Sequence, residues 1–276
     1  MNDIQKRILT SPALWPATLK SCVCRLLGRK DAIVETHGIR MRASLEKGKG
    51  LWCSVGGLEY EAEMRDALGL LDPGDVFVDV GANVGVYSLH AARRVGPSGK
   101  VFFFEPTTET YERISENIRL NGFKNMKGFE KAVADKEGTV DFMVCESNNS
   151  NYIGTGTLTE EERGSMEVRT VPVDTIDALA SREGVDKVAL IKIDAEGAEL
   201  LVMKGALEVI RSSRPAILFE SCLDGSPLSE RDFLKAEGYE LYHLEGKTWH
   251  KGADDHYGNV LGIAREDHAR KLGIVR

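Results

Sequence analysis

The sequence lacks any hydrophobic run that approaches the length of a membrane-spanning helix, so we expect no membrane-spanning helix. Pro12 and Pro16 interrupt the N-terminal stretch before the apolar core of a signal peptide can form. These two absences predict a soluble protein that is not exported, and we expect a cytoplasmic location.

Cysteine is scarce and basic runs are missing. The five cysteines are scattered, none forms a CxxC pair, and no histidine cluster has zinc-ligand spacing, so we expect reduced thiols and predict no metal ligands among them. The 43 acidic residues outnumber the 36 basic ones, which gives a formal charge of −7. Without a sustained run of Lys or Arg, nucleic acid is not an expected partner.

The chain is long enough for one large α/β domain. Its 276 residues are 42% apolar, and the regular alternation of strands and helices begins only near Asp75. We therefore predict an N-terminal extension or cap over residues 1–58 and a catalytic domain over residues 59–276. Within the extension, Ile33 to Ala43 alternates weakly and predicts a hairpin.

Residues Leu14 to Lys30 combine apolar side chains with basic ones such as Lys20 and Arg25. A basic amphipathic segment can make peripheral contact with a membrane surface. A helix packed on the domain, or on the partner in a homodimer, is commoner. The sequence leaves these alternatives open.

Beyond residue 75, short apolar runs that end in glycine or an acidic residue alternate with helical patterns. This rhythm predicts a doubly wound, Rossmann-like α/β fold with a mostly parallel, seven-stranded sheet. The last two strands have no helix between them, which predicts an antiparallel closing strand. The expected strands are Val76 to Val80, Lys100 to Glu105, Met126 to Val133, Thr139 to Val144, Val168 to Val173, Val188 to Asp194, Ala216 to Glu220, Tyr239 to Leu244 and Asn259 to Ala264.

A glycine turn, DVGANVG, follows the first of these strands, from Asp79 to Gly85. Gly81 and Gly85 permit a sharp turn and a close approach of a ligand to the backbone, and Asn83 can hydrogen-bond either. The dinucleotide pattern GxGxxG is absent, which argues against a nicotinamide cofactor. A ligand without phosphate, such as S-adenosylmethionine (SAM), fits better, since its amino-acid end needs polar groups such as Asp79 and Asn83.

Glu105 ends the next strand, 24 residues after Gly81. An acidic side chain at this position can accept both hydrogens of a ribose diol. Alone it could be a solvated carboxylate before Pro106, but together with the glycine turn it predicts SAM as the cofactor.

Carboxylates also end two later strands, Asp194 and Glu196 in IKIDAEGAE and Glu220 in AILFE. Together they predict an acidic rim, Asp194, Glu196 and Glu220, that could deprotonate a hydroxyl, bind a divalent cation or orient a substrate. Alternatively, Asp194 caps the following helix and Glu196 favours its positive N-terminus.

The segments DVGANVG, FFFEP, NGFKN, KAVAD, VPVDTIDAL, IKIDAEGAELLVMKGA and RPAILFE occur in an order that resembles the FkbM-like methyltransferase family. The resemblance covers roughly Tyr60 to Glu220. It implies a class I SAM-methyltransferase fold and O-methylation of a hydroxyl on a sugar, glycan, glycolipid or polyketide. By matched position it implies SAM contacts for Asp79, Gly81, Asn83, Gly85, Glu105 (ribose) and Ala132 (adenine).

For catalysis we predict that a base removes the proton of the acceptor hydroxyl, with Asp194 the first choice and Glu196 or His256 behind it. Tyr60 and Glu61 match a family Tyr-Glu pair, and with Glu220 and Asn259 they are predicted substrate contacts. A divalent cation is possible but not predicted. The alternatives are a non-catalytic module that binds SAM or S-adenosylhomocysteine, and a methyltransferase that acts on nitrogen or on protein.

Overall fold

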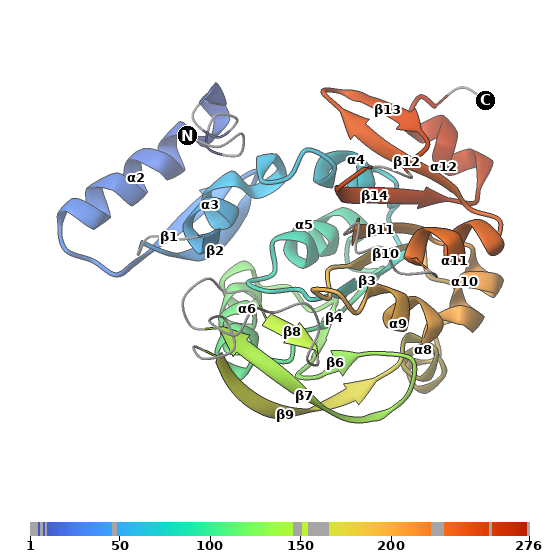
Figure 1. The fold of residues 1–276 in the computed structure, drawn as a ribbon. Coiled ribbons are helices and arrows are strands. Elements are labelled where there is room, and N and C mark those ends of the chain that lie inside the picture. Colours follow the sequence, from blue (N-terminus) through green and yellow to red (C-terminus); the bar gives the residue numbers. More distant parts are fainter. Residues whose placement is uncertain are drawn as a thin grey trace.

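The computed structural model describes residues 5, 8, 10–45, 49–145, 151–153, 166–221, 229–253 and 256–274. Its centre is a sheet of strands β3 (Val76–Val80), β4 (Lys100–Phe104), β5 (Met126–Phe129), β10 (Leu190–Ile193), β11 (Ala216–Ser221), β12 (Glu240–Glu245), β13 (Thr248–Lys251) and β14 (Gly258–Ile263). These eight strands lie in the order β13-β12-β14-β11-β10-β3-β4-β5 (Figure 1).

Strand directions in the central sheet confirm the predicted doubly wound topology. Strands β5, β4, β3, β10 and β11 are parallel, and β14 is antiparallel to both β11 and β12. The additional edge strand β13 was not predicted, because only Trp249 of its four residues is buried and no apolar alternation marks it. The carboxyl ends of the parallel strands therefore share one edge, as a binding site in this fold requires.

A second, four-stranded sheet lies beside the first. Its strands are β6 (Ala132–Val133), β7 (Gly138–Cys145), β8 (Asn151–Ile153) and β9 (Met166–Asp174), in the order β6-β9-β7-β8. The sequence predicted strands here but not a separate sheet. The stretch from Glu146 to Ser165 is rich in Ser, Asn, Gly and Thr and has no period, which predicts a loop, and most of it lies outside the described residues.

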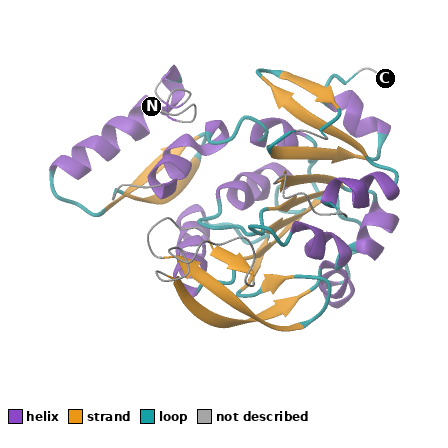
Figure 2. Ribbon diagram, viewed as in Figure 1, coloured by secondary structure: helices purple, strands orange, loops and turns teal. Residues whose placement is uncertain are grey.

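Helices cover both faces of the central sheet (Figure 2). Neighbouring residues of β3 pack into different cores, Phe77 on one face and Val78 on the other. The first face carries α4 (Met64–Gly69), α5 (Val86–Val95), α6 (Thr108–Asn121) and α12 (Glu266–Lys271). The second carries α8 (Ile176–Glu183), α9 (Glu199–Lys204), α10 (Leu207–Ser213) and α11 (Glu230–Ala236).

Two local expectations near these helices had different outcomes. The sequence predicts one helix from about Ala198 to Ser212, but the chain divides it into α9 and α10 at Gly205, where an added Cβ would lie 2.0 Å from the backbone oxygen of Ala134. Ser229, three residues before Asp232, is a candidate N-cap in the sequence, and the structure confirms it because its hydroxyl accepts a hydrogen bond from the Asp232 N–H.

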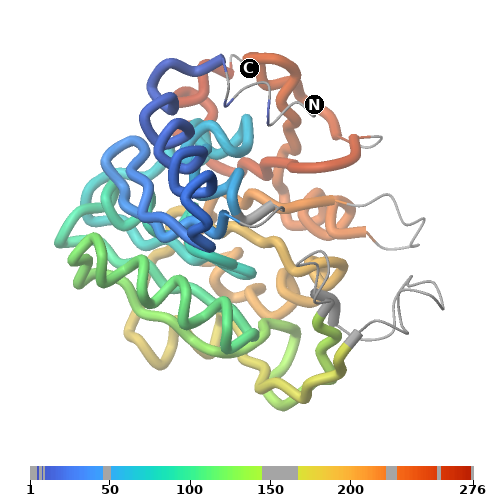
Figure 3. The backbone as a smooth tube through the Cα atoms, turned by 90° about the vertical axis from the view of Figure 1, so that its left-hand side faces the viewer, coloured from blue at the N-terminus to red at the C-terminus, as the bar shows by residue number. Residues whose placement is uncertain are grey.

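The N-terminal part forms a small lobe with its own two-stranded sheet, at the front in Figure 3. The predicted hairpin is confirmed, and its second strand docks on α6 because the Arg42 N–H donates to the Asn117 side chain at 2.8 Å. No helix among the described residues is long and apolar enough to span a membrane. The lobe comprises η1 (Pro12–Leu14), α2 (Trp15–Leu26), β1 (Asp31–Thr36), β2 (Ile39–Ser44), α3 (Lys49–Gly56) and η2 (Gly57–Glu59).

Candidate active site

The glycine turn after β3 needs glycine for two different steric reasons. Gly81 has φ 74°, and an added Cβ would lie 1.9 Å from the backbone oxygen of Asp194. Gly85 has φ 90°, and its added Cβ would meet the side chain of Ile114 at 2.5 Å. Asn83 is also left-handed, with φ 51°, a conformation that asparagine tolerates better than most residues. The turn thereby brings β3 and β10 together at their carboxyl ends.

Gly81→Ala is expected to destabilise the chain by about 3 kcal/mol or more, because backbone strain adds to a clash with the backbone of Asp194. Gly122→Ala is the matched control. It has φ 70° and nothing within 4 Å of an added Cβ, so only strain of about 1 kcal/mol is expected. Urea unfolding measures the free energy of unfolding of both variants. Equal losses in the two variants would show that the clash with Asp194 adds nothing to the backbone strain at Gly81.

Glu105 is buried at the end of β4 and fixed by its own loop. One carboxylate oxygen accepts the Asn83 N–H at 3.0 Å, and the other accepts both the N–H and the hydroxyl of Thr107, at 3.1 and 2.6 Å. Burial raises the pKa of Glu105, while these hydrogen bonds oppose the rise. Because a carboxylate oxygen has two acceptor positions, only the oxygen facing Asn83 keeps one for a ligand.

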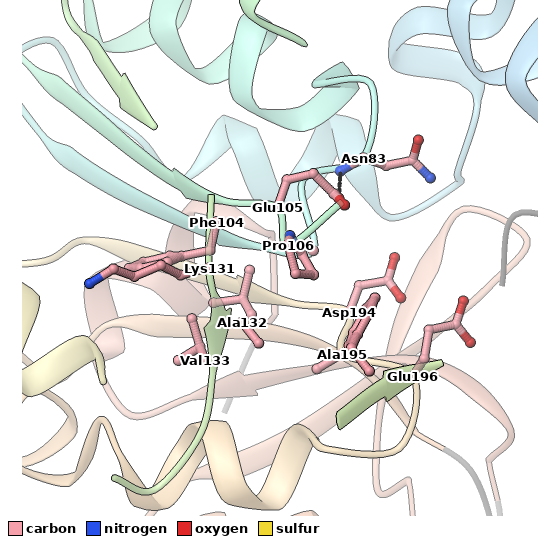
Figure 4. A pocket seen from close by; sticks show the side chains of 13 residues that line it. Asn83, Phe104, Glu105, Pro106, Lys131, Ala132, Val133, Asp194, Ala195 and Glu196 are labelled. Carbon is pink, nitrogen blue, oxygen red and sulfur yellow. Dashed lines mark hydrogen bonds between the residues drawn. The ribbon is translucent and has the colours of Figure 1, made fainter. Parts of the chain in front are cut away.

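A first cavity, of about 560 Å³ including space open to solvent, lies at this edge of the sheet (Figure 4). Asn83 and Glu105 line it on one side, Ala132 of β6 lies beside Lys131, and Asp194 and Glu196 lie at the opposite end. The second sheet supplies the wall at Ala132, so the cavity lies between the two sheets. It therefore unites most of the predicted cofactor residues.

A second cavity, of about 1080 Å³ including space open to solvent, shares Gly81, Asn83, Asp194 and Glu196 with the first. The predicted substrate contacts all gather along its walls, although they come from distant parts of the chain. These residues are Tyr60, Glu61, Glu220 and Asn259. The two cavities thus meet at the acidic rim.

Lys192 is a buried cation beneath the second cavity. It lies in β10 in register with Asp79 of β3, and its ammonium group donates to the Asp194 carboxylate at 2.8 Å. Burial alone would lower the pKa of Lys192, but the carboxylates of Asp194, Asp79 and Glu61 outweigh it and raise the pKa. Lys192 therefore remains charged and balances three carboxylates.

Asp79 and Glu61 are the other two carboxylates around Lys192. Asp79 is fully buried, with one oxygen accepting the Ser88 hydroxyl at 2.6 Å; its other oxygen has no hydrogen-bond partner among the described residues. Glu61 accepts hydrogen bonds from the Tyr87 hydroxyl and, at 3.3 Å, from the Asn259 amide. Burial raises the pKa of both carboxyl groups, and Lys192 opposes the rise.

Glu220 is the last residue but one of β11 and pairs with Asn259 of β14. Burial, reinforced by the negative charges of Asp194 and Glu196, raises the pKa of Glu220 to about 7. A carboxyl group with this pKa can take up and release a proton near neutral pH.

The loop after β10 holds Asp194 and Glu196 at the cavities rather than at a helix terminus. Glu199 satisfies the loop backbone, because its carboxylate accepts the N–H groups of Ala195 and Gly197 at 3.0 Å. Ala198 is the N-cap residue of α9, and no side chain caps this helix. The alternative in which Asp194 caps the helix is therefore wrong.

His256 lies apart from this arrangement. Its ring stacks on that of His243 with centroids 4.7 Å apart, and it lines neither cavity. Burial and the charge of His243 lower the pKa of His256. Within the described ranges, no group of three His, Cys, Asp or Glu side chains is placed to hold a metal ion.

Residues 79–241 match the family model described as the methyltransferase FkbM domain. The chain belongs to this family of SAM-dependent methyltransferases. The FkbM match includes the glycine turn, Glu105 and the whole acidic rim, whereas Tyr60, Glu61 and Asn259 lie outside it.

Three curated proteins are similar to this FkbM chain. Methyltransferase sdnD of Sordaria araneosa is 30% identical over 156 residues, which are 48% of this chain and 60% of that protein. Hexuronic acid methyltransferase AglP of Haloferax volcanii is 27% identical over 186 residues, 67% and 72% of the two chains. 2-O-methyltransferase NoeI of Sinorhizobium fredii is 27% identical over 164 residues, 54% and 65%. The chain thus spans less than two thirds of sdnD and of NoeI.

Among solved structures, the crystal structure of methyltransferase FkbM from Methylobacillus flagellatus is similar to the chain at 14% identity and a TM-score of 0.45. The similarity covers 77% of this FkbM chain and 53% of that one.

Sequence reasoning missed Lys192 and Tyr87 as parts of the candidate site. A signal for Lys192 was present, since a lysine between Ile191 and Ile193 in a buried strand needs counter-charges. Tyr87 gave no such signal, because a tyrosine in the first turn of an amphipathic helix is usually interpreted as a side chain that packs in the core. Both residues act on Glu61, so the site extends below the predicted rim.

Proposed function

We propose that this FkbM domain transfers a methyl group from SAM to a neutral hydroxyl of a sugar unit in a glycan, glycolipid or related acceptor. Two relatives, named as a hexuronic acid methyltransferase and a 2-O-methyltransferase, support transfer to an oxygen of a sugar-like acceptor. The observation that carries the proposal is a carboxyl group with a pKa of about 7, Glu220, in a cavity that joins the predicted cofactor cavity.

The residues along the two joined cavities fit SAM by their chemistry, with Glu105 and Ala132 in the lining of the first and Asp79 in the lining of the second. The unpaired oxygen of Asp79 suits the ammonium group at the amino-acid end, and the remaining acceptor position of Glu105 suits one ribose hydroxyl. Ala132 supplies an apolar wall for the adenine. When bound, SAM supplies a methyl group on a positively charged sulfur, a charge that the surrounding carboxylates favour.

Glu220 is our proposed general base, in place of the earlier first choice, Asp194. Asp194 already uses one oxygen in the ion pair with Lys192, whereas Glu220 combines access to the second cavity with a pKa suited to proton uptake. Asp194 and Glu196 then act on Glu220 through their charges and on the substrate through their position at the junction of the cavities.

The charge of the second cavity favours a neutral acceptor group. Its walls include the whole acidic rim together with Glu61. Among the described residues that line it the cation is Lys192, which is already surrounded by carboxylates. A carboxylate placed for methylation here would meet repulsion from like charges. A hydroxyl meets no such repulsion and can donate its proton to Glu220.

The test of this function is transfer of labelled methyl from SAM to a panel of neutral saccharides, matched uronic acids and a peptide mixture. We expect label in saccharides whose acceptor position is a free hydroxyl, and none when that hydroxyl is replaced by hydrogen. Label confined to peptides would support a protein methyltransferase instead. SAM binding without transfer to any component, from this panel through fractionated cell extracts, would support the non-catalytic alternative.

Glu105→Gln is expected to weaken SAM binding about 10- to 100-fold, because one charge-assisted hydrogen bond is lost and a backbone donor loses its acceptor. Glu109→Gln is the matched control, since Glu109 is exposed on α6 and pairs with Arg169 outside both cavities. Calorimetric titration with SAM measures both variants. An unchanged Kd for Glu105→Gln would exclude Glu105 from the cofactor site.

A further inference from the structure

Helix α2 presents an apolar face to solvent. The large apolar side chains of this face are 46–87% exposed, whereas Ala17, Ser21 and Cys24 form the side that packs on the lobe. We define the outer face of α2 by Trp15, Leu19, Val23, Leu26 and Leu27.

The spacing of these residues makes a single stripe. At 100° per residue, positions 15, 19, 23 and 26 lie within one sector of about 80°, and the buried positions 17, 21 and 24 lie within another sector across the helix. A surface helix normally turns its apolar side inward. In α2 the small residues face inward and the large apolar residues face outward.

The segment that carries the outer face has side-chain charges of one sign. Residues 4–30 contain six Lys or Arg and no Asp or Glu, whereas the rest of the chain has 30 basic and 43 acidic residues. Within the described part of this segment, Lys20, Arg25, Arg29 and Lys30 are all exposed. The segment thus combines exposed apolar area with local positive charge on an otherwise acidic protein.

The position of α2 leaves this face accessible. Figure 1 shows α2 at the periphery of the N-terminal lobe, with the β1–β2 hairpin between it and the rest of the molecule. In Figure 3, which is turned by 90°, the same helix lies towards the viewer. The two views agree that α2 is on the outside of the lobe.

We propose that α2 binds the surface of an anionic membrane, with its outer face among the lipid headgroups and the flanking basic residues against lipid phosphates. Trp15 and the leucines suit the headgroup boundary, and Lys and Arg suit anionic lipid. A two-fold dimer through this face would bring the same positive charges of two copies together. An anionic membrane neutralises them.

The experiment is co-sedimentation of the full chain with vesicles of equal parts phosphatidylglycerol and phosphatidylcholine, and with vesicles of phosphatidylcholine alone. We expect binding to the mixed vesicles, weakening as salt rises, and at least tenfold weaker binding to phosphatidylcholine alone, since each basic residue contributes roughly fivefold. The double variant Leu19→Ser/Leu26→Ser should bind the mixed vesicles at least tenfold more weakly. Val168→Ser, on β9 and 60% exposed, should bind like the wild type.

Three outcomes would overturn the proposal. These are no binding to the mixed vesicles, equal binding by the double variant, and a wild-type dimer in sedimentation velocity that the double variant converts to monomer. Circular dichroism checks that the variants are folded. Methyl transfer to a soluble acceptor should be the same in the double variant and the wild type, so loss of vesicle binding is separable from loss of the proposed activity.

Discussion

Glu220→Gln is expected to lower kcat by about two to four orders of magnitude, the usual contribution of a general base. Glutamine preserves the size of the side chain but cannot take up the proton of the acceptor hydroxyl. Because Glu220 is not among the proposed SAM contacts, the Kd for SAM should change little. Single-turnover methyl transfer, with SAM binding measured in parallel, separates the two effects.

The pH dependence gives a second measure of the same residue. A base works only when deprotonated, so kcat/KM of the wild type should rise with pH through about 7 and then level off. Glu220→Gln should lose this rise. Glu196→Gln should move it to lower pH, because removing a neighbouring negative charge lowers the pKa of Glu220.

Asp194→Asn distinguishes Glu220 from our first sequence-based choice. If Asp194→Asn abolished transfer and the pH-dependent rise while Glu220→Gln retained both, the base would be Asp194. If Glu220 is the base, Glu220→Gln should lose both the transfer and the rise of kcat/KM with pH. Asp194→Asn should keep this rise but show it at lower pH, because the charge of Asp194 raises the pKa of Glu220.

Lys192→Met is expected to destabilise the fold by about 3–5 kcal/mol at neutral pH, the usual effect of removing one partner from a buried ion pair. The substitution keeps an apolar stem of similar length but leaves Asp79, Glu61 and Asp194 without their cation. Lys127→Met is the matched control. Lys127 is half exposed and pairs with Glu183 at 2.7 Å, so a loss of about 1 kcal/mol or less is expected.

The loss of unfolding free energy in Lys192→Met should grow as the pH rises. Without Lys192, the already raised pKa values of Asp79 and Glu61 rise further above those of the unfolded chain. The folded variant then binds protons that the unfolded chain releases, so its unfolding free energy falls as pH rises from about 4 through the folded pKa values. Urea unfolding should show a larger deficit at mildly alkaline than at mildly acidic pH; a deficit independent of pH would contradict this electrostatic role.

The sequence was sufficient to predict the backbone conformation at the candidate cofactor site. Left-handed backbone conformations occur in the structure at Gly81, Asn83 and Gly85. The residue types alone predict such conformations. Glu105 was predicted from its position after a strand, and its bond to the Asn83 N–H joins the two motifs. The glycine turn and the position of Glu105 depend on residue spacing within short segments, so both could be predicted without knowing how the chain packs.

The base could not be chosen from the sequence. Asp194, Glu196 and Glu220 are equivalent as strand-end carboxylates, and only their surroundings separate them: Asp194 is paired with Lys192, and Glu220 is buried near two like charges. The predicted division at residue 58 also stays a prediction. In the same way, the apolar residues of α2 were visible in the sequence, but which of its faces is solvent-exposed depends on how the lobe packs.

The linkage of the transferred methyl group tests the central claim most directly. Incubation with SAM carrying a carbon-13 methyl group and a labelled saccharide acceptor, followed by NMR, identifies the atom to which the methyl carbon is bound. We predict an ether on a sugar oxygen that survives alkali, formed by the wild type and at a rate about two to four orders of magnitude lower by Glu220→Gln. A methyl ester that alkali removes, or a methyl group bound to nitrogen, would contradict a hydroxyl methyltransferase in which Glu220 is the base.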